Sequence, residues 1–448
     1  MTLRRRSRVA IALSATALLA LTACSTVEPT PSGDPADPGT GPGDAILTGQ
    51  GVSSDPCPDA VNAENGCIYL GVLSDLTEGP FAALAVPITD GQRGFWKKVN
   101  EDGGIGGYDI NIDANTRDTK YQPAEHSAQF AQISSNVAAI AQSLGTVNTE
   151  GVLPQTKQLS LVTVPTSWWS GYAFEEYDDG LLLETGYSYC TEAIVGLDWF
   201  AENHSAPTRV QAVGYPGDYG GDSAAGVARW AEVNGVTALD PIGTGPNQVV
   251  QNQDAVVSAV LAGSPDVVVL AVGPAETAEI IGKLAAGGFQ GRFLGSLPTW
   301  NHALLGSPAA PALIALYNHL TPYQNWGEES AGMDALRDSL GGALPANGGY
   351  IIGWSIGYPL KAALEKAAAD GDLTPEGIAA AAQGLTVDFE GLAETLTYGG
   401  DPQAGAQQTA NIGTPNPDVE LGMETIASFY KGATFDKTDY SSACIASN

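Results

Sequence analysis

Short apolar runs alternate with longer amphipathic segments between residues 68 and 295. The run at residues 266–272 is continuous and rich in valine, which is typical of a strand covered on both faces. We expect strands at residues 68–73, 108–114, 138–142, 159–163, 209–214, 266–272 and 292–295. We expect helices at residues 88–100, 124–134, 150–158, 222–234, 253–262 and 275–286. Because the pattern restarts at Arg209, it predicts an α/β chain with two open parallel-sheet lobes and right-handed crossovers.

The amino terminus has the order of an export signal. Four arginines between positions 4 and 8 precede an uncharged apolar stretch at residues 9–23. This stretch is shorter than the about 20 residues that a membrane span needs. It ends in Leu21-Thr22-Ala23-Cys24, which resembles the lipobox of bacterial lipoproteins. That resemblance implies that residues 1–23 are a signal peptide and that Cys24 carries a lipid; an ordinary secretory signal is the alternative.

The segment after Cys24 has the composition of a linker. Residues 25–54 are rich in Pro, Gly, Ser, Thr and Asp, and their few apolar residues have no period. Such a segment buries too little surface to offset its chain entropy. We therefore expect residues 24–66 to form a lipid-anchored flexible tether.

Charge narrows the range of partners. The chain has 19 basic and 50 acidic residues and a formal net charge of −31, and cleavage of the signal removes four arginines and no acid. No basic patch is expected, which argues against nucleic acid and against electrostatic attraction to anionic lipid. No later stretch is long and apolar enough to span a bilayer.

Four cysteines remain besides Cys24, and an even number in an exported chain predicts two disulfides with three possible connectivities. Cys57 and Cys67 lie close together at the border of the tether and the first strand, so we expect them to pair. Cys190 and Cys444 would then tie the carboxyl tail to the body. We expect no metal site, since there is no C-x-x-C and no His has ligand spacing.

Ligands of open α/β sheets bind beyond the carboxyl ends of the strands, where loops enter helix N-termini. The corresponding loops here are rich in Gly, Ser, Thr, Tyr and Trp, and their hydroxyls and free N–H groups suit a carboxylate or another anion. These loops are residues 74–81, 145–149, 166–171, 215–221, 273–276 and 296–301.

Several motifs, taken in order, carry a family resemblance. Residues 68–81 read Ile-Tyr-Leu-Gly-Val-Leu-Ser-Asp-Leu-Thr-Glu-Gly-Pro-Phe, Gly91-Gln92 follows, and residues 99–107 read Val-Asn-Glu-Asp-Gly-Gly-Ile-Gly-Gly. With residues 138–167 and 209–296 they resemble the branched-chain amino-acid (leucine/isoleucine/valine) binding protein family over nearly all of residues 68–448. The resemblance implies a type I periplasmic-binding-protein fold with three hinge crossovers, and the permease subunits of an ABC transporter as partners.

The resemblance also implies a division into lobes. We place the crossovers near Cys190, residues 317–323 and Tyr398. Lobe 1 then comprises residues 67–189 and 322–397, and lobe 2 comprises residues 190–321 and 398–448. We expect a monomer on the outer face of the cell membrane, with no enzymatic activity and no cofactor.

The family's ligand-binding positions can be carried over residue by residue. The loop with Thr146, Asn148 and Thr149 matches one that holds the ligand carboxylate, and Thr166 and Ser167 match a pair that supports the same group. Each of these side chains also has a purely structural interpretation as a helix cap.

Aromatic residues complete the expected site. Tyr219 matches a tyrosine that closes over the ligand from lobe 2, with Asp218 beside it. The residues expected to line an apolar or aromatic wall are Phe81, Trp168, Trp169, Trp300 and Trp354. Core packing is the alternative role of each tryptophan.

Two departures from the family concern the ligand. Amino-acid binders commonly have an acidic residue for the ligand ammonium after the strand at 292–295, where this chain has Ser296 and Leu297, and Gly273-Pro274 replaces a frequent aromatic residue. Burying an unpartnered ammonium costs several kcal/mol. We therefore expect a small ligand with a carboxylate or amide and no essential ammonium, an apolar or aromatic acid rather than a free branched-chain amino acid. Asp218 or Asp222 is the alternative counter-charge.

Two other functions compete with transport. One is a ligand-sensing module for a membrane receptor, which the lack of a later membrane span disfavours. The other is a serine hydrolase, because Gly353-Trp354-Ser355-Ile356-Gly357 fits G-x-S-x-G, follows an apolar run at 350–352 that we interpret as a strand, and precedes an expected helix at 358–369. However, all four histidines precede Ser355, whereas that fold needs its histidine last.

Overall fold

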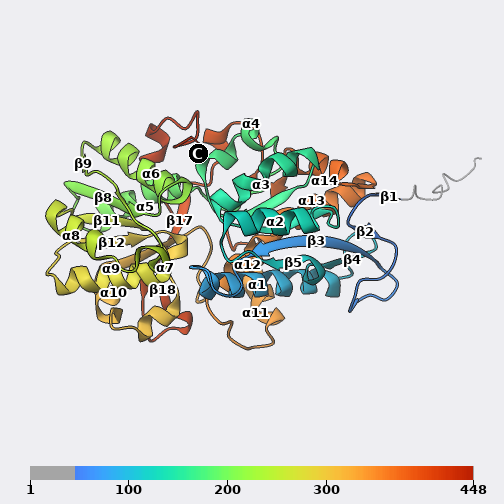
Figure 1. Ribbon diagram of the computed structural model, residues 1–448, viewed down its shortest axis with the longest axis horizontal. Helices are drawn as coiled ribbons and strands as arrows, with labels where there is room; N and C mark the ends of the chain where they lie inside the picture. The colour runs from blue at the N-terminus through green and yellow to red at the C-terminus, as the bar shows by residue number, and fades with distance from the viewer. Residues whose placement is uncertain (1–45, 447–448) are drawn as a thin grey trace, which may run out of the picture. The chain divides into compact units, whose positions relative to one another are not determined.

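The first sheet is organised around one buried strand. The computed structural model describes residues 46–446. Within them, β3 (Gly66–Ser74) is the middle strand of a six-stranded sheet, and Tyr69 is the one residue of β3 that is partly exposed. Its parallel neighbours are β4 (Tyr108–Asn111), β5 (Thr116–Asp118) and β6 (Ala139–Leu144), with β7 (Thr163–Thr166) beyond β6 and β2 (Val52–Ser53) antiparallel. The helices that pack on this sheet or on one another beside it are α1 (Ala82–Glu101), α2 (Pro123–Ile133), α3 (Thr146–Gln158), α11 (Ala331–Ser339), α12 (Gly349–Ser355), α13 (Gly357–Asp370) and α14 (Pro375–Ala382) (Figure 1).

The second sheet is mixed. Its order within the described residues is β10–β8–β11–β12–β13–β17–β18, with β9 also paired to β8. The parallel strands are β8 (Arg209–Gly214), β9 (Thr237–Ala238), β10 (Ile242–Gly243), β11 (Val267–Ala271), β12 (Arg292–Gly295) and β13 (Tyr317–Thr321). The antiparallel strands are β17 (Thr409–Pro415) and β18 (Met423–Lys431). The predicted parallel arrangement does not extend to this edge, where the seven residues between β17 and β18 are too few for a parallel crossover.

Helices accompany the second sheet in the expected alternation. They are α5 (Tyr189–Asn203), α6 (Asp218–Asn234), α7 (Asn247–Val250), α8 (Asp254–Gly263), α9 (Pro274–Ala286) and α10 (Ala310–Leu316) (Figure 1). No helix within residues 46–446 is both long enough and apolar enough to span a membrane.

The chain passes between the two sheets in three places. It leaves the first sheet after β7, passing through α4 (Glu175–Asp178) to α5, and returns to it after β13. It leaves again after the hairpin of β15 (Thr386–Val387) and β16 (Leu396–Thr397), and reaches β17 through α15 (Pro402–Gly405). The lobe boundaries drawn from the sequence stay a prediction.

Part of the expected tether belongs to the folded body. β1 (Leu47–Thr48) pairs in parallel with β14 (Asp372–Leu373), and β2 pairs with β3. Ile46 and Val52 pack against the core, and the Cys57–Cys67 disulfide joins this segment to β3. The expectation of a flexible tether is therefore wrong for residues 46–66, whose few apolar side chains find partners far along the chain. Residues 24–45, including Cys24, lie outside the described residues.

Three expected strands differ from the observed elements. The strand expected at 108–114 ends at Asn111, and a 3-10 helix (Asp113–Asn115) follows, in which the Ala114 N–H donates a hydrogen bond to the Asn111 side chain (3.0 Å). The strand expected at 159–163 begins only at Thr163, because α3 extends to Gln158 and a turn follows. The run at 350–352, interpreted as a strand, is helical in α12.

Candidate functional site

Loops of the first sheet meet where its parallel strands end. After β3, the buried carboxylate of Asp75 accepts hydrogen bonds from the backbone N–H groups of Gly79 (2.9 Å) and Phe81 (3.0 Å). Burial raises the pKa of Asp75 above its usual value, and these N–H groups partly offset that increase. The loop so held places the Phe81 ring 4.7 Å from the Tyr121 ring.

Two threonine hydroxyls lie next to this loop. Gly145 follows β6 with a φ of +95°, and a side chain there would meet the Tyr121 ring at 2.7 Å, so the turn into α3 requires glycine. Its N–H donates to the carbonyl of Thr166 (3.3 Å) at the end of β7, which brings Thr146 and Thr166 together. The Oγ1 atoms of both threonines are buried and have no hydrogen-bond partner among the described residues.

The second sheet contributes Tyr219 and Leu297. The Tyr219 hydroxyl donates to the carbonyl of Val272 (3.2 Å) and is also hydrogen-bonded to the Ser296 hydroxyl (2.7 Å). The main chain of Leu297 is held on both sides: its N–H donates to Glu192 Oε1 (2.9 Å), and His319 Nε2 lies 3.1 Å from its carbonyl. Burial raises the pKa of Glu192 well above its usual range, which favours the protonated form of this carboxyl beside the wall.

Side chains from both sheets surround a narrow cavity. About 450 Å³ of space here is not filled by protein atoms, and this figure includes space that is open to solvent. Its wall is aromatic and aliphatic except for the threonines, and it is lined by Phe81, Leu84, Ala85, Ile88, Tyr121, Leu144, Gly145, Thr146, Thr166, Trp168, Tyr189, Tyr219, Leu297, Pro298 and Ile352. No charged side chain is among these lining residues. Burial raises the pKa of Tyr121, Tyr189 and Tyr219, so these phenols stay protonated.

The structure brings half of the expected ligand-binding residues to this cavity. Those that line it are Phe81, Thr146, Thr166, Trp168 and Tyr219. Asp218 begins α6, and its side chain lies outside the described part of the chain.

The other expected residues have partners of their own. Asn148 Nδ2 donates to the Leu144 carbonyl (2.9 Å), and Thr149 Oγ1 is bonded to the Ser143 hydroxyl (2.8 Å). The Ser167 hydroxyl is bonded to that of Tyr172 (3.1 Å).

The remaining tryptophans lie outside this cavity. Trp169 packs edge-on to Tyr172 and Tyr177, and Trp354 packs edge-on to Phe95. Trp300 lines a neighbouring cavity.

Several lining residues were not expected from the sequence. Tyr121 follows β5, a strand that the sequence analysis did not predict. Ile352 was assigned to a strand, and Leu297 was interpreted only as a missing acid. The position of Tyr121 was hidden because the strand before it was not predicted. That of Ile352 was hidden because periodicity does not distinguish a helix from a strand in a short apolar run.

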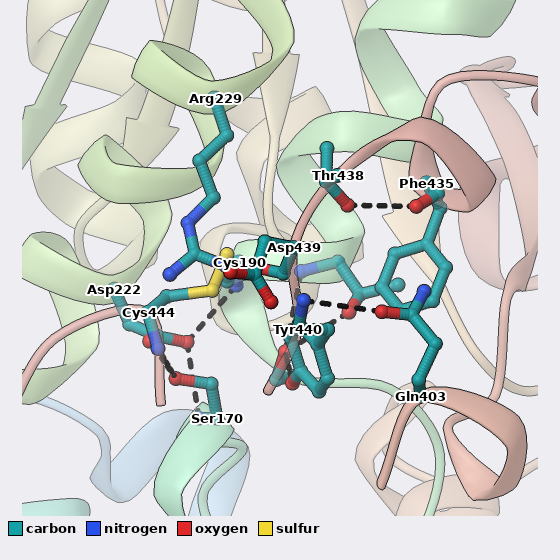
Figure 2. Close-up of a disulfide and its surroundings, with 12 residues drawn as sticks. Ser170, Cys190, Asp222, Arg229, Gln403, Phe435, Thr438, Asp439, Tyr440 and Cys444 are labelled. Atoms are coloured by element: carbon teal, nitrogen blue, oxygen red, sulfur yellow. Dashed lines mark hydrogen bonds between the residues drawn. A yellow bond between two sulfur atoms is a disulfide. The ribbon is translucent and has the colours of Figure 1, made fainter. Parts of the chain in front are cut away.

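Asp222, one alternative counter-charge, is engaged elsewhere. Its carboxylate accepts hydrogen bonds from the N–H groups of Cys190 (3.0 Å) and Ser170 (3.1 Å) and from the Ser170 hydroxyl. Figure 2 shows this group beside the Cys190–Cys444 disulfide, where the Cys444 N–H donates to Ser170 Oγ (2.8 Å). Burial raises the pKa of Asp222 to about 7. Both expected disulfides are confirmed.

The surroundings of Ser355 do not provide a nucleophile elbow. Ser355 is fully buried at the end of α12, and the residues before it are helical, whereas the elbow needs a strand and an exposed hydroxyl. The glycines of the motif serve packing instead: a side chain at Gly353 would overlap the Ile88 carbonyl of α1, and one at Gly357 would overlap the Phe95 ring. No group of three or more His, Cys, Asp or Glu suited to a metal ion occurs in residues 46–446.

Comparisons with known proteins agree with this architecture. The family described as "Periplasmic binding protein" matches residues 68–416, and no curated protein sequence matches significantly. The chain is similar in structure to the fatty acid ABC transporter substrate-binding protein from Thermomonospora curvata (TM-score 0.78, 24% identity, covering 88% of this chain and 97% of that one). It is also similar to a branched chain amino acid ABC transporter protein from Thermus thermophilus with bound valine (0.70, 18%, 83% and 98%). A third is a solute binding protein of an ABC transporter from Rhodopseudomonas palustris HaA2 in complex with p-hydroxybenzoic acid (0.66, 15%, 83% and 99%).

Proposed function

The chain belongs to the periplasmic binding protein family, and we propose that it is the solute-binding lipoprotein of an ABC importer that captures a small carboxylate- or amide-bearing ligand between its two sheets. Its type I periplasmic-binding-protein fold is the one that the sequence predicted. Within this family the cleft is where a solute is held, so the chemistry of the cavity wall defines the ligand.

The observation that carries the proposal is the pair of unpartnered hydroxyls. Buried polar groups are nearly always hydrogen-bonded, and leaving one unpaired costs about 1–3 kcal/mol. Thr146 Oγ1 and Thr166 Oγ1 lie at the two neighbouring strand ends, and Thr146 is also the first residue of α3. The free N–H groups of a helix start add further donors for an anion. A carboxylate or an amide oxygen of the ligand satisfies this set.

The rest of the cavity wall favours a ligand with an apolar body and no essential ammonium group. The lining residues include five aromatic side chains and no carboxylate, and Ser296 is occupied by Tyr219. The names of the similar structures mention a fatty acid, valine and p-hydroxybenzoic acid; two of these three are acids without an ammonium. We therefore favour an apolar or aromatic acid over free leucine, isoleucine or valine.

Thr146→Val tests the carboxylate site. Valine has nearly the shape of threonine, and since the hydroxyl has no protein partner, the unliganded protein should keep its stability. Hydrogen bonds to a charged group contribute about 1.5–3 kcal/mol, so affinity for an apolar monocarboxylate should fall roughly ten- to hundredfold in calorimetry.

Thr156→Val is the matched control. Thr156 is also buried in α3, but its hydroxyl donates to the Val152 carbonyl (3.1 Å) within the helix. This variant should keep its affinity. Equal affinities of the wild type and Thr146→Val, or micromolar binding of leucine that is abolished by Asp218→Asn, would contradict the proposed ligand chemistry.

The location and partners form the remainder of the proposal. A lipid on Cys24 would hold the protein at the outer face of the membrane, within reach of the permease subunits, and the protein would act as a monomer. The two lobes, residues 67–189 with 322–397 and residues 190–321 with 398–448, would close on the ligand about the three crossovers.

A further inference from the structure

A second cavity adjoins the first and shares part of its wall. Leu84, Leu297 and Ile352 line both cavities, so these aliphatic side chains stand between the two spaces. About 530 Å³ of the second space is not filled by protein atoms. Its wall differs from that of the first cavity, because polar side chains such as His319 and Gln324 are interspersed with the aromatic rings. The proposed function makes no use of this second space.

His319, one of the residues that line this second cavity, has a hydrogen-bond acceptor that is unpaired within residues 46–446. Its Nε2 lies 3.1 Å from the Leu297 carbonyl, and since a carbonyl only accepts, Nε2 must carry the hydrogen. Burial lowers the pKa of His319 to about 4, so the ring is neutral at pH 7 and Nδ1 keeps its lone pair. Nδ1 is buried and has no hydrogen-bond partner among the described residues. The Leu297 carbonyl therefore fixes the His319 tautomer in which Nε2 carries the hydrogen and Nδ1 is an acceptor unpaired in the described part of the chain.

Gln324 provides a second unpaired acceptor. Its Nε2 donates to the Glu329 carbonyl (3.3 Å), which leaves Oε1 buried and without a partner within residues 46–446. Two buried acceptors in one wall are costly unless a donor reaches them from outside the chain. The second cavity has no acidic lining residue, so a neutral hydroxyl suits it better than an ammonium.

From these observations we infer that the ligand spans both cavities and carries a hydroxyl at the end remote from its carboxylate. The inference rests on the proposed function, which holds the carboxylate at Thr146 and Thr166. The apolar middle of the ligand passes between the shared aliphatic side chains, and the hydroxyl donates to His319 Nδ1 or Gln324 Oε1. The chemical class is an apolar monocarboxylate with a terminal hydroxyl. Trp300, stacked on Tyr317 with ring centroids 5.9 Å apart, provides a flat wall beside its far end.

Matched acids test the inference. Octanoic, decanoic and dodecanoic acid and their ω-hydroxy counterparts are titrated by calorimetry into the wild type, His319→Phe, Gln324→Met and Thr146→Val. In an apolar chamber the added hydroxyl would weaken binding, because it loses water without gaining a partner. With an acceptor present, the best ω-hydroxy acid should bind the wild type about three- to tenfold more tightly than the plain acid of equal length.

The variants assign the effect to the second cavity. The ratio of the two affinities should fall to about one or below in His319→Phe or Gln324→Met, and it should stay unchanged in Thr146→Val, which weakens both acids alike. Thermal unfolding checks that each variant folds. If His319→Phe is unfolded, Gln324→Met and the wild-type pairs still decide.

Failure of the inference is distinguishable from failure of the proposed function. Weaker binding of the ω-hydroxy acid at every length, with plain acids still sensitive to Thr146→Val, would overturn the inference and leave the proposed function standing. No binding of any of these acids to the wild type would overturn the inference, and the proposed function would fall with it only if aromatic acids and short amides also failed to bind. A preference for ω-hydroxy acids that persists in both His319→Phe and Gln324→Met would also overturn the inference.

Discussion

Removing the Cys190–Cys444 disulfide should destabilise the protein more than removing the Cys57–Cys67 disulfide. The two bonds join residues that are 254 and 10 positions apart. In the chain-entropy description, a disulfide restricts the unfolded chain more when the loop it closes is longer, by a term that rises with the logarithm of loop length. That relation gives roughly 5.5 kcal/mol for the long loop and roughly 2.7 kcal/mol for the short one.

Contacts other than the disulfide hold the carboxyl-terminal segment against the folded body. The carboxyl-terminal segment is docked by more than its sulfur: Phe435 and Tyr440 are almost fully buried, and the Tyr440 hydroxyl is bonded to that of Ser188 (3.0 Å). In Figure 2 the Tyr440 N–H also donates to Gln403 Oε1 (3.1 Å). Because these contacts survive loss of the bond, the folded tail stays in place, and the unfolded chain carries most of the effect.

The measurement is equilibrium unfolding in urea of the wild type, Cys190→Ala/Cys444→Ala and Cys57→Ala/Cys67→Ala. Tryptophan fluorescence and far-ultraviolet circular dichroism must give coincident transitions before a free energy of unfolding is extracted. The free energy of unfolding should be about 3 kcal/mol lower for the long-loop variant than for the short-loop variant. The Cys57→Ala/Cys67→Ala variant serves as the control, since it also loses two largely buried sulfur atoms.

An equal loss in the two variants, or a larger loss for the short loop, would refute the loop-length reasoning. Limited proteolysis adds a second check. Rapid cleavage of the tail in Cys190→Ala/Cys444→Ala under native conditions would show that the burial of Phe435 and Tyr440 does not hold the segment by itself.

Two further predictions concern the membrane anchor and pH. Cys24→Ala should release the protein into the medium, since acyl chains contribute about 0.8 kcal/mol per buried CH₂; sedimentation with membranes after this change would reveal another anchor. Burial raises the pKa of Asp222 from 3.8 to about 7, with Arg229 acting in the opposite sense, so the folded protein binds this proton more tightly than the unfolded chain. The stabilisation is complete below about pH 4 and is lost as the pH rises to about 7, by at most about 1.4 kcal/mol per pH unit. Asp222→Asn should therefore flatten the melting temperature over that range in calorimetry, and parallel curves for the two proteins would contradict this.

The sequence by itself determined the architecture, because the signals for it are local. The valine run of β11 and the alternation of strands and helices lie within short windows and were enough to predict the α/β class, and the resemblance carried by the order of the motifs implied the type I fold. The proximity of Cys57 and Cys67 likewise determined both disulfides, since only one other pair remained.

Only the tertiary structure decided which side chains form the cavity wall. Thr146 and Thr149 have the same side chain at neighbouring positions, yet Thr149 is bonded to Ser143, whereas Thr146 lines the cavity without a partner. The cavity beside Thr146 is completed by side chains that are distant in sequence, such as Tyr219 and Leu297, and no periodicity records their proximity.

The same reason explains the errors in the elements. The run at 350–352 is apolar in a strand or in a buried helix, and its helical state follows from the close approach of α12 to α1, which the glycines permit. That packing places Ile352 in the wall beside Leu84 and Leu297, side chains that come from segments far apart in the chain. Periodicity reports which face of an element is buried, but it does not report which other element packs against that face. A binding cavity is formed by contacts between elements, so periodicity cannot predict its wall.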